Sequence, residues 1–309
     1  MNAAVLELIK KSAAVPSMPQ VVTRFLDVMQ DPSFDYRDLA KVLSTDPGTV
    51  SEILRLCNSA LFGLRQRVAS LQQALTLLGP KRTRSLLLGR YLVDALAQKP
   101  AAGLDMVYFW RRSLTTAVVS ARMAGVVIPR MKEETFCVGL LADIGIPILA
   151  EALGESFIPV VARFGPCKTP MTADEERKTV GASHGEVSAM VLAHWTLPEA
   201  VHRPVNLHQS ANPGSDEIGT IARIVNGGDR ISRLLCEGSD PATIVSVCTA
   251  AVAFARADLQ GFTELLPAIE TDIHELATVL RMDVIPNRVY SLVVKTLKEH
   301  LGLVAAPSA

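Results

Sequence analysis

Helical periodicity along nearly the whole of this 309-residue chain limits its fold more than any other feature. Apolar residues recur at spacings of three and four, and no segment shows the alternation typical of a strand. Helix-start signals fall at the same places: Asp46 precedes Pro47, Ser70 opens another segment, and Asp35 stands three residues before Asp38. We therefore predict an all-α fold, with helices at about 18–29, 36–43, 47–58, 71–79, 80–96, 107–125, 133–152, 155–164, 184–195, 198–208, 217–236, 241–257, 263–281 and 287–301.

Composition excludes several classes of protein. Hydrophobic residues make up 49% of the chain and charged residues 20%, which favours a large buried core over disorder. The 31 basic residues balance the 31 acidic ones, so the chain has no bulk affinity for nucleic acid or an anionic membrane. The five cysteines show no CxxC spacing, and neither a signal peptide nor an uncharged apolar run of ~18 residues is evident. We expect a cytoplasmic protein with reduced cysteines.

Asp143 is the polar residue that stands out. It lies inside the apolar stretch Phe136–Leu149, which we predict to be one continuous helix. A buried carboxylate is costly unless a cation, a metal or several donors satisfy it. We therefore expect Asp143 to have a role beyond packing.

Several ordered motifs carry a resemblance to a known family. They read V-P-S-M-P at 15–19, S-T-D-P-G at 44–48, L-C-N-S-A at 56–60, Q-A-L-T-L-L-G at 73–79, F-W-R-R-S at 109–113 and L-L-A-D-I-G at 140–145. From about residue 10 to about residue 235 the chain resembles an HDOD domain, the non-catalytic relative of the HD and HD-GYP metal-dependent phosphohydrolases of bacterial signalling proteins.

The resemblance implies a two-lobed organisation. It predicts an HD-domain-like helical lobe preceded by an N-terminal helical lobe, and an Ala/Gly/Pro-rich stretch at 97–105 is a suitable linker. We expect the N-terminal lobe at 1–100, a degenerate HD-like lobe at 101–238 and a C-terminal helical extension at 239–309. Residues 165–183 and 209–216 are rich in Pro, Gly, Thr and Asn, and we predict loops there.

The resemblance also implies a degraded metal site. Catalytic relatives hold a metal with two histidines and two aspartates, and the two histidine positions here are Arg112 and Ala142. Asp143 is retained, and the second aspartate falls on Asp229. Because a guanidinium keeps its charge and can grip a carboxylate with two hydrogen bonds, we hypothesise that an Arg112–Asp143 ion pair replaces the metal.

Relatives with two metals add further histidines. His184 matches one of them, and His208–Gln209 matches a His–His pair whose second member is lost. Asp143, His184, His208 and Asp229 could still bind zinc or iron, or could form a polar hydrogen-bond network. Because Arg112 would repel a cation, we expect the network and no cofactor. The vestigial positions are Arg112, Ala142, Asp143, His184, His208, Gln209 and Asp229.

The interval between Glu52 and Asp94 contains basic residues and no acidic one. This asymmetry indicates one of two arrangements. The basic residues form a patch that binds an acidic partner, or they lie at a solvated helix end beside acidic residues from other parts of the chain. Acidic residues of the C-terminal extension, such as Asp272, could pair with this basic interval, either within one chain or between two chains arranged head to tail. The candidate patch comprises Arg65, Arg67, Lys81, Arg82, Arg84 and Arg90.

Residues 39–55 resemble a helix-turn-helix, whose second helix would present Thr49, Ser51, Glu52 and Arg55 to DNA bases. The HDOD family uses this helix pair for packing, and Glu52 would meet phosphate unfavourably. We therefore expect no nucleic-acid partner. The preferred function is a non-catalytic regulatory module that binds signalling proteins (response regulators or cyclic-dinucleotide enzymes) or an anionic small ligand, with a homodimer as a further option. A metal-dependent phosphohydrolase acting on cyclic dinucleotides and a helix-turn-helix regulator are the alternatives.

Overall fold

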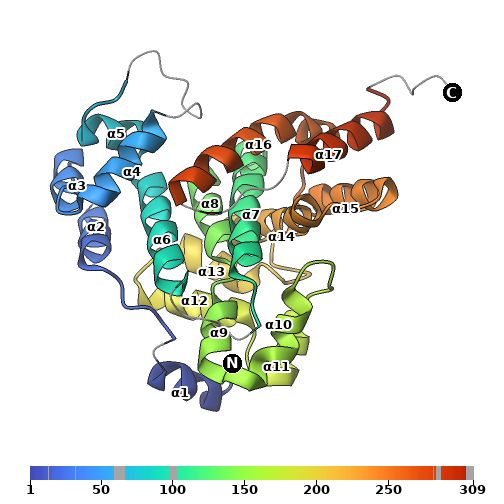
Figure 1. The fold of residues 1–309 in the computed structure, drawn as a ribbon, viewed down its shortest axis with the longest axis horizontal. Coiled ribbons are helices and arrows are strands. Elements are labelled where there is room, and N and C mark those ends of the chain that lie inside the picture. Colours follow the sequence, from blue (N-terminus) through green and yellow to red (C-terminus); the bar gives the residue numbers. More distant parts are fainter. Residues whose placement is uncertain are drawn as a thin grey trace.

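The computed structural model describes residues 1–12, 14–31, 33–58, 67–97, 103–280, 282 and 287–303. Every regular element among these residues is a helix, which confirms the all-α prediction (Figure 1). The helices are α1 (Ala3–Lys11), α2 (Gln20–Gln30), α3 (Tyr36–Leu43), α4 (Pro47–Cys57), α5 (Leu71–Leu78), α6 (Pro80–Ala97), α7 (Met106–Val127), α8 (Lys132–Leu141), α9 (Gly145–Leu153), α10 (Ile158–Phe164), α11 (Ala173–Val180), α12 (His184–His194), α13 (Glu199–Leu207), α14 (Glu217–Glu237), α15 (Pro241–Phe254), α16 (Leu259–Leu280) and α17 (Asn287–His300), with short 3-10 turns at Pro129–Met131 and Gly154–Phe157.

Helix-start signals placed most of these boundaries correctly. Asp35 and Asp38 form a capping box at the start of α3, and the Ser70 side chain accepts from the backbone of Gln73 at the start of α5. The expected start of α2 at Ser17 is wrong. That helix begins after Pro19, and the Ser17 carbonyl instead accepts the Tyr91 hydroxyl across the lobe.

Two helices were not predicted. α1 precedes the first expected helix, and α11 lies inside 165–183, where we predicted only loop. A capping box between Thr172 and Glu175 starts α11, and Gly181 ends it with a φ of 84°. The signal for α11 was therefore present in the sequence as Thr-x-x-Glu, but the polar composition of the segment obscured it.

The helix predicted across Asp143 is in fact two helices. α8 ends at Leu141, α9 begins at Gly145, and Ala142–Ile144 form the turn between them. A Cβ atom at Gly145 would lie 2.1 Å from the carbonyl oxygen of His184, so only glycine allows this close approach of α9 to α12. At this break, Oδ1 of Asp143 lies 3.3 Å from Nε2 of His184, the first residue of α12.

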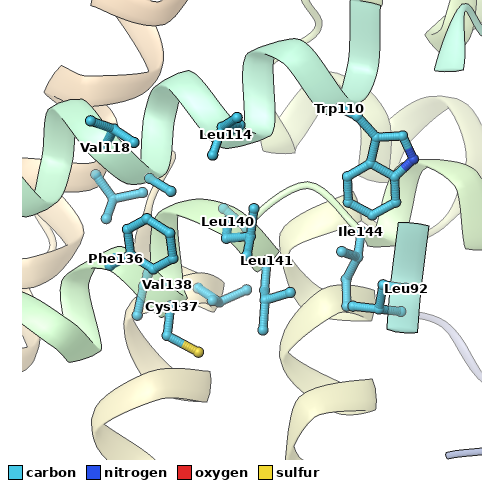
Figure 2. Packing of buried hydrophobic residues seen from close by; sticks show 14 of the residues in the cluster. Leu92, Trp110, Leu114, Val118, Phe136, Cys137, Val138, Leu140, Leu141 and Ile144 are labelled. Atoms are coloured by element: carbon cyan, nitrogen blue, oxygen red, sulfur yellow. The ribbon is translucent and has the colours of Figure 1, made fainter. Parts of the chain in front are cut away.

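The core is built around α7, α8 and α14. α7 packs along both of the others, and α6, α13 and α16 cover the remaining sides. Leu114 and Val118 of α7 point toward Phe136 and Leu140 of α8, and all four side chains are buried (Figure 2). Burial of such aliphatic and aromatic side chains stabilises the fold by roughly 1.5–3 kcal/mol each.

Helices from all three predicted segments of the chain pack on one another. α2–α6 contact one another, and α6 also packs on α8. α1 packs on α9, and the Asn2 backbone N–H donates to the carbonyl of Gly181. α16, from the predicted C-terminal extension, crosses α7 and also contacts α4 and α6 (Figure 1). The boundary near residue 100 stays a prediction.

The stretch Pro129–Phe164 is apolar enough to cross a membrane by length and composition alone, with a mean hydropathy of 1.9 in its most apolar window. Of that window, 78% is buried within the protein. Its residues include Leu140, Leu141 and Ile148, which are fully covered by neighbouring helices. The apolar character of the stretch therefore serves the helical core.

Candidate functional site

Asp143, His184 and His208 converge at the junction of α8, α9, α12 and α13. Asp143 lies in the turn after α8, His184 is the first residue of α12, and His208 caps the end of α13. The Nε2 atoms of His184 and His208 lie 3.3 Å and 3.4 Å from Oδ1 of Asp143, and 3.4 Å from each other. All three side chains are largely shielded from solvent.

The second nitrogen of each imidazole has its own partner. Nδ1 of His184 lies 2.7 Å and 2.9 Å from the two carboxylate oxygens of Glu176, and the His184 backbone N–H donates to the same group at 2.7 Å. Nδ1 of His208 lies 2.6 Å from the carbonyl oxygen of Val205. A carbonyl only accepts, so Nδ1 of His208 carries a proton, and the Glu176 carboxylate fixes Nδ1 of His184 in the same way. Both Nε2 atoms therefore face Asp143.

The cluster attracts positive charge. Burial opposes a charge on the His184 ring, yet the carboxylates of Glu176 and Asp143 raise the pKa of His184 to about 10. Burial likewise opposes the charge on Asp143, but hydrogen bonds from His184 and His208 hold the pKa of Asp143 well below its usual value. Negative carboxylates and imidazoles therefore favour a proton or a cation between them.

Arg112 pairs with Asp229, so the predicted Arg112–Asp143 ion pair is wrong. Nη2 of Arg112 donates to Oδ1 of Asp229, and the guanidinium carbon lies 4.8 Å from the ring centre of Phe164 and 5.9 Å from that of Tyr108. Burial opposes the charge, but Asp229 and Asp143 together raise the pKa of Arg112 above its usual value. The physical reason for the correction is competition: the two histidines already take the Asp143 carboxylate.

The other positions that the resemblance named, Ala142, Gln209 and Asp229, flank the cluster without joining it. Ala142 is buried in the turn before Asp143, and its methyl group offers no ligand. Gln209 and Asp229 line a cavity of about 20 Å³ together with Arg112, Asp143 and His184. Among the described residues, the group able to hold a metal ion is Asp143, His184 and His208, so Asp229 does not belong to the four-residue set that the sequence suggested.

A larger pocket adjoins this cavity. It has a volume of about 560 Å³, and it lies between the segment 169–172, α14 and the start of α15. Gln209 and Asp229 line both spaces. The other polar residues that line the pocket are Thr169, Thr172, Asn226, Arg230, Arg233, Glu237, Ser239 and Thr243.

Sequence reasoning missed the partners that hold the cluster in place. Glu176 lies on the unpredicted helix α11, and it is 2% exposed although it is a carboxylate. Tyr108 and Phe164 supply the aromatic faces beside Arg112. Only Glu176 had a local signal, the capping box that starts α11, because the two aromatic residues looked like ordinary core residues.

Three residues of the candidate basic patch have acidic partners in the structure. Nζ of Lys81 lies 2.6 Å from Glu134, Nε of Arg82 lies 4.0 Å from Glu133, and Arg90 pairs with both Glu52 and Asp94. Arg84 is 4% exposed, Arg67 is exposed, and Arg65 lies outside the described residues. Acids from neighbouring helices therefore accompany the basic residues, while Asp272 of the extension pairs with Arg122 of α7.

The helix-turn-helix-like segment is engaged in internal contacts. The Thr49 hydroxyl donates to Asp46, Glu52 pairs with Arg90, and Arg55 donates to the carbonyl of Thr278 on α16. α4 itself packs on α5 and α16. Three of the four residues that would face DNA bases therefore have partners inside the protein.

Comparison with known proteins gives the family. The sequence model of the HDOD domain family matches residues 15–211 of this chain. The chain therefore belongs to the HDOD family. An uncharacterised protein of Treponema pallidum (strain Nichols) is 22% identical over 229 residues, and the chain spans 44% of the length of this relative. The similarity therefore covers less than half of that relative.

Solved structures share the fold. A candidate phosphohydrolase from Shewanella amazonensis SB2B matches with a TM-score of 0.70 and 21% identity, covering 90% of this chain and 98% of its own. An HDOD domain protein of unknown function from Geobacter sulfurreducens matches at 0.66 with 20% identity, covering 89% and 96%. A candidate signal transduction protein from Marinobacter aquaeolei VT8 matches at 0.62 with 19% identity, covering 90% of this chain and 65% of its own.

Proposed function

We propose that this chain is a non-catalytic regulatory module that acts by binding a signalling protein or an anionic small ligand. The observation that carries the proposal is Arg112. Its guanidinium is buried, paired with Asp229 and flanked by Phe164 and Tyr108 at the position where the resemblance expects a metal-binding histidine. A permanent cation and the methyl group of Ala142 remove two of the four ligands of the hydrolytic centre.

The volumes of the two cavities beside Asp229 support the same proposal. The cavity beside Asp143 measures about 20 Å³, which suits one water-sized molecule but not a nucleotide phosphate. The adjoining pocket of about 560 Å³ is within the usual size range for small-molecule sites. A ligand in this pocket would contact Gln209 and Asp229, so its binding would change the surroundings of the Arg112–Asp229 ion pair.

The names of the structural neighbours support a role in signalling in general terms only. One structural neighbour is named as a candidate signal transduction protein and another as a candidate phosphohydrolase. We place the protein in the cytoplasm, where its five free cysteines would stay reduced. Response regulators and cyclic-dinucleotide enzymes are the partners to examine first.

A hydrolysis assay tests the proposal. The full chain would be incubated with cyclic dinucleotides and with a generic phosphodiester, in the presence of Mn²⁺, Fe²⁺ or Zn²⁺. We expect no turnover above that of the metal alone, whereas thermal-shift titration should detect binding of an anionic ligand. Turnover that the variant His208→Ala abolishes and His194→Ala retains would overturn the proposal.

A metal-dependent phosphohydrolase with a reduced site is the second candidate, because Asp143, His184 and His208 still converge. Three protein ligands and one open position are the usual arrangement of catalytic zinc. The hydrolysis assay separates the two candidates, since only this one predicts turnover.

A further inference from the structure

We propose that the cavity between α6, α7, α8 and α16 is a binding site for a small organic phosphate. The cavity has a volume of about 290 Å³, and residues of all four helices line it. It shares no lining residue with the cavity beside Asp143 or with the pocket beside Asp229. The inference therefore goes beyond the proposed function and stands whether or not that function holds. The charged residues that line the cavity are Arg82, Arg122, Lys132, Glu133 and Asp272.

Basic groups outnumber acidic ones in this cavity. Three of its charged residues are basic and two are acidic, a formal net charge of +1, whereas the whole chain has a net charge of zero. The side chains of Arg82 and Arg122 are 19% and 28% exposed. Because water screens such partly buried charges less than it screens surface charges, they would attract an anion more strongly.

Both acidic groups of the cavity are already directed to a basic neighbour. The two carboxylate oxygens of Asp272 accept from Nε and Nη2 of Arg122, at 2.6 Å and 2.7 Å. Oε2 of Glu133 lies 4.0 Å from Nε of Arg82, at the outer limit of an ion pair. An entering anion would therefore find Asp272 neutralised, and it would have to compete mainly with Glu133 for Arg82.

Lys132 is the basic residue that this arrangement leaves over. It is the first residue of α8, and its ammonium group makes no hydrogen bond or ion pair with the part of the chain that the structure describes. A cation in the first turn of a helix opposes the helix dipole, which favours acidic residues there. The charge of Lys132 therefore does not stabilise α8, whereas an anion in the cavity would give this charge a partner.

The rest of the lining and the volume favour a phosphate ester over a phosphate ion. Apolar side chains, among them Phe136 and Leu276, complete the wall of the cavity. The volume lies near the lower end of the range for small-molecule sites. Guanidinium and ammonium groups both bind phosphate oxygens, and a phosphate ester carries nearly two negative charges above pH 7. Such a ligand would place its oxygens against Arg82 and Lys132 and its organic part against the apolar wall.

The position of the cavity gives a bound ligand a structural effect. Arg82 comes from α6, Lys132 from α8 and Asp272 from α16, the helix that crosses α7 (Figure 1). One ligand would thus contact helices of all three segments that the sequence predicts. Binding should therefore hold α16 more firmly against α7, and limited proteolysis within α16 should become slower.

Calorimetric titration of the full chain with phenyl phosphate at pH 8 tests the inference. We expect one phenyl phosphate per chain, bound several-fold more tightly than inorganic phosphate because Phe136 and Leu276 can contact the phenyl ring. Phenyltrimethylammonium, which carries the opposite charge, should not bind. Lys132→Gln should weaken binding of phenyl phosphate about 10-fold or more, because it removes a charge-assisted hydrogen bond. Glu133→Gln should strengthen binding several-fold, since the competing carboxylate is gone. A purely structural role of the two residues does not predict these opposite effects.

Two further variants serve as controls. Lys178→Gln removes the same charge from an exposed position on α11 and should bind phenyl phosphate as the wild type does. Arg230→Gln removes a charge from the pocket beside Asp229 and should also leave binding unchanged. Circular dichroism would check that each variant folds, and if Lys132→Gln does not, the gain in Glu133→Gln still tests the site. Absence of saturable binding to the wild type, an unchanged affinity in folded Lys132→Gln, or a loss in Arg230→Gln alone would overturn the inference.

Discussion

Arg112 and Asp229 form an ion pair that links α7 to α14 beside the histidine cluster. The arginine side chain is 2% exposed and the aspartate side chain 25% exposed, so the pair stands at the boundary between the core and the pocket that Asp229 lines. Asp229 pairs with the guanidinium, while His184 and His208 contact Asp143. The pairing with Asp229 thus keeps the permanently charged Arg112 guanidinium apart from the cluster of Asp143, His184 and His208, which can accept a proton or a metal ion.

Removing the charge of Arg112 should destabilise the protein. Arg112→Met leaves the Asp229 carboxylate without its partner and removes the contact with the Phe164 ring. Breaking a buried ion pair costs about 3–5 kcal/mol, and the partial exposure of Asp229 favours the low end of that range. Urea unfolding monitored by circular dichroism would measure the difference.

The double variant Arg112→Met/Asp229→Asn should recover part of this loss, because no unpaired charge remains. The control is Arg203→Met, whose exposed pair with Glu199 lies on the surface of α13 and should contribute little. A loss for Arg112→Met no greater than that for Arg203→Met would contradict the structural role of the pair.

Gly145→Ala should destabilise the protein and also disturb the histidine cluster. The added Cβ would lie 2.1 Å from the His184 carbonyl oxygen, so the α8–α9 turn must move away from α12. Overpacking of this kind typically costs 1–3 kcal/mol. Gly165→Ala is the control, because a Cβ there meets no atom within 4 Å and its φ is −66°. Equal unfolding midpoints for the two variants would show that the close approach is not required.

The sequence predicted the helical class and most helix boundaries, because caps, prolines and apolar spacing are local signals. It predicted a polar cluster of Asp143, His184, His208 and Asp229 only through the family resemblance, and Asp229 lies outside the cluster that the structure shows. It could not predict that Arg112 turns to Asp229, since both carboxylates were available and the choice depends on how α7 and α14 pack. The sequence did not predict the break at Ala142–Ile144 either, because it also depends on packing between helices. Gly145 is needed for the close approach of α9 to α12, and nothing in the local sequence signals this contact.

The cysteines should differ strongly in reactivity toward an alkylating reagent at pH 8. Burial raises the pKa of Cys57 to about 11 and those of Cys236 and Cys248 to about 12, so few of these thiols are in the reactive thiolate form. Cys167 is exposed and should react first. Mass spectrometry of partly labelled protein would identify the sites, and urea should make all the thiols react. Labelling of Cys248 before Cys167 in the folded protein would contradict this order.

The pair between Arg122 and Asp272 should hold the C-terminal extension against α7. Nε and Nη2 of Arg122 lie 2.6 Å and 2.7 Å from the two carboxylate oxygens of Asp272, a two-bonded contact that is shielded from solvent at the aspartate. Asp272→Asn removes the charge and one acceptor, so we expect a loss of about 1.5–3 kcal/mol in unfolding free energy. Limited proteolysis should then cleave within α15–α17 several times faster than in the wild type. The control is Glu299→Gln, which removes an exposed i,i+4 pair with Lys295 on α17 and should leave the cleavage rate unchanged. If both variants are cleaved at the wild-type rate, the attachment of α16 depends on its apolar residues alone, and the ion pair contributes nothing to joining the lobes.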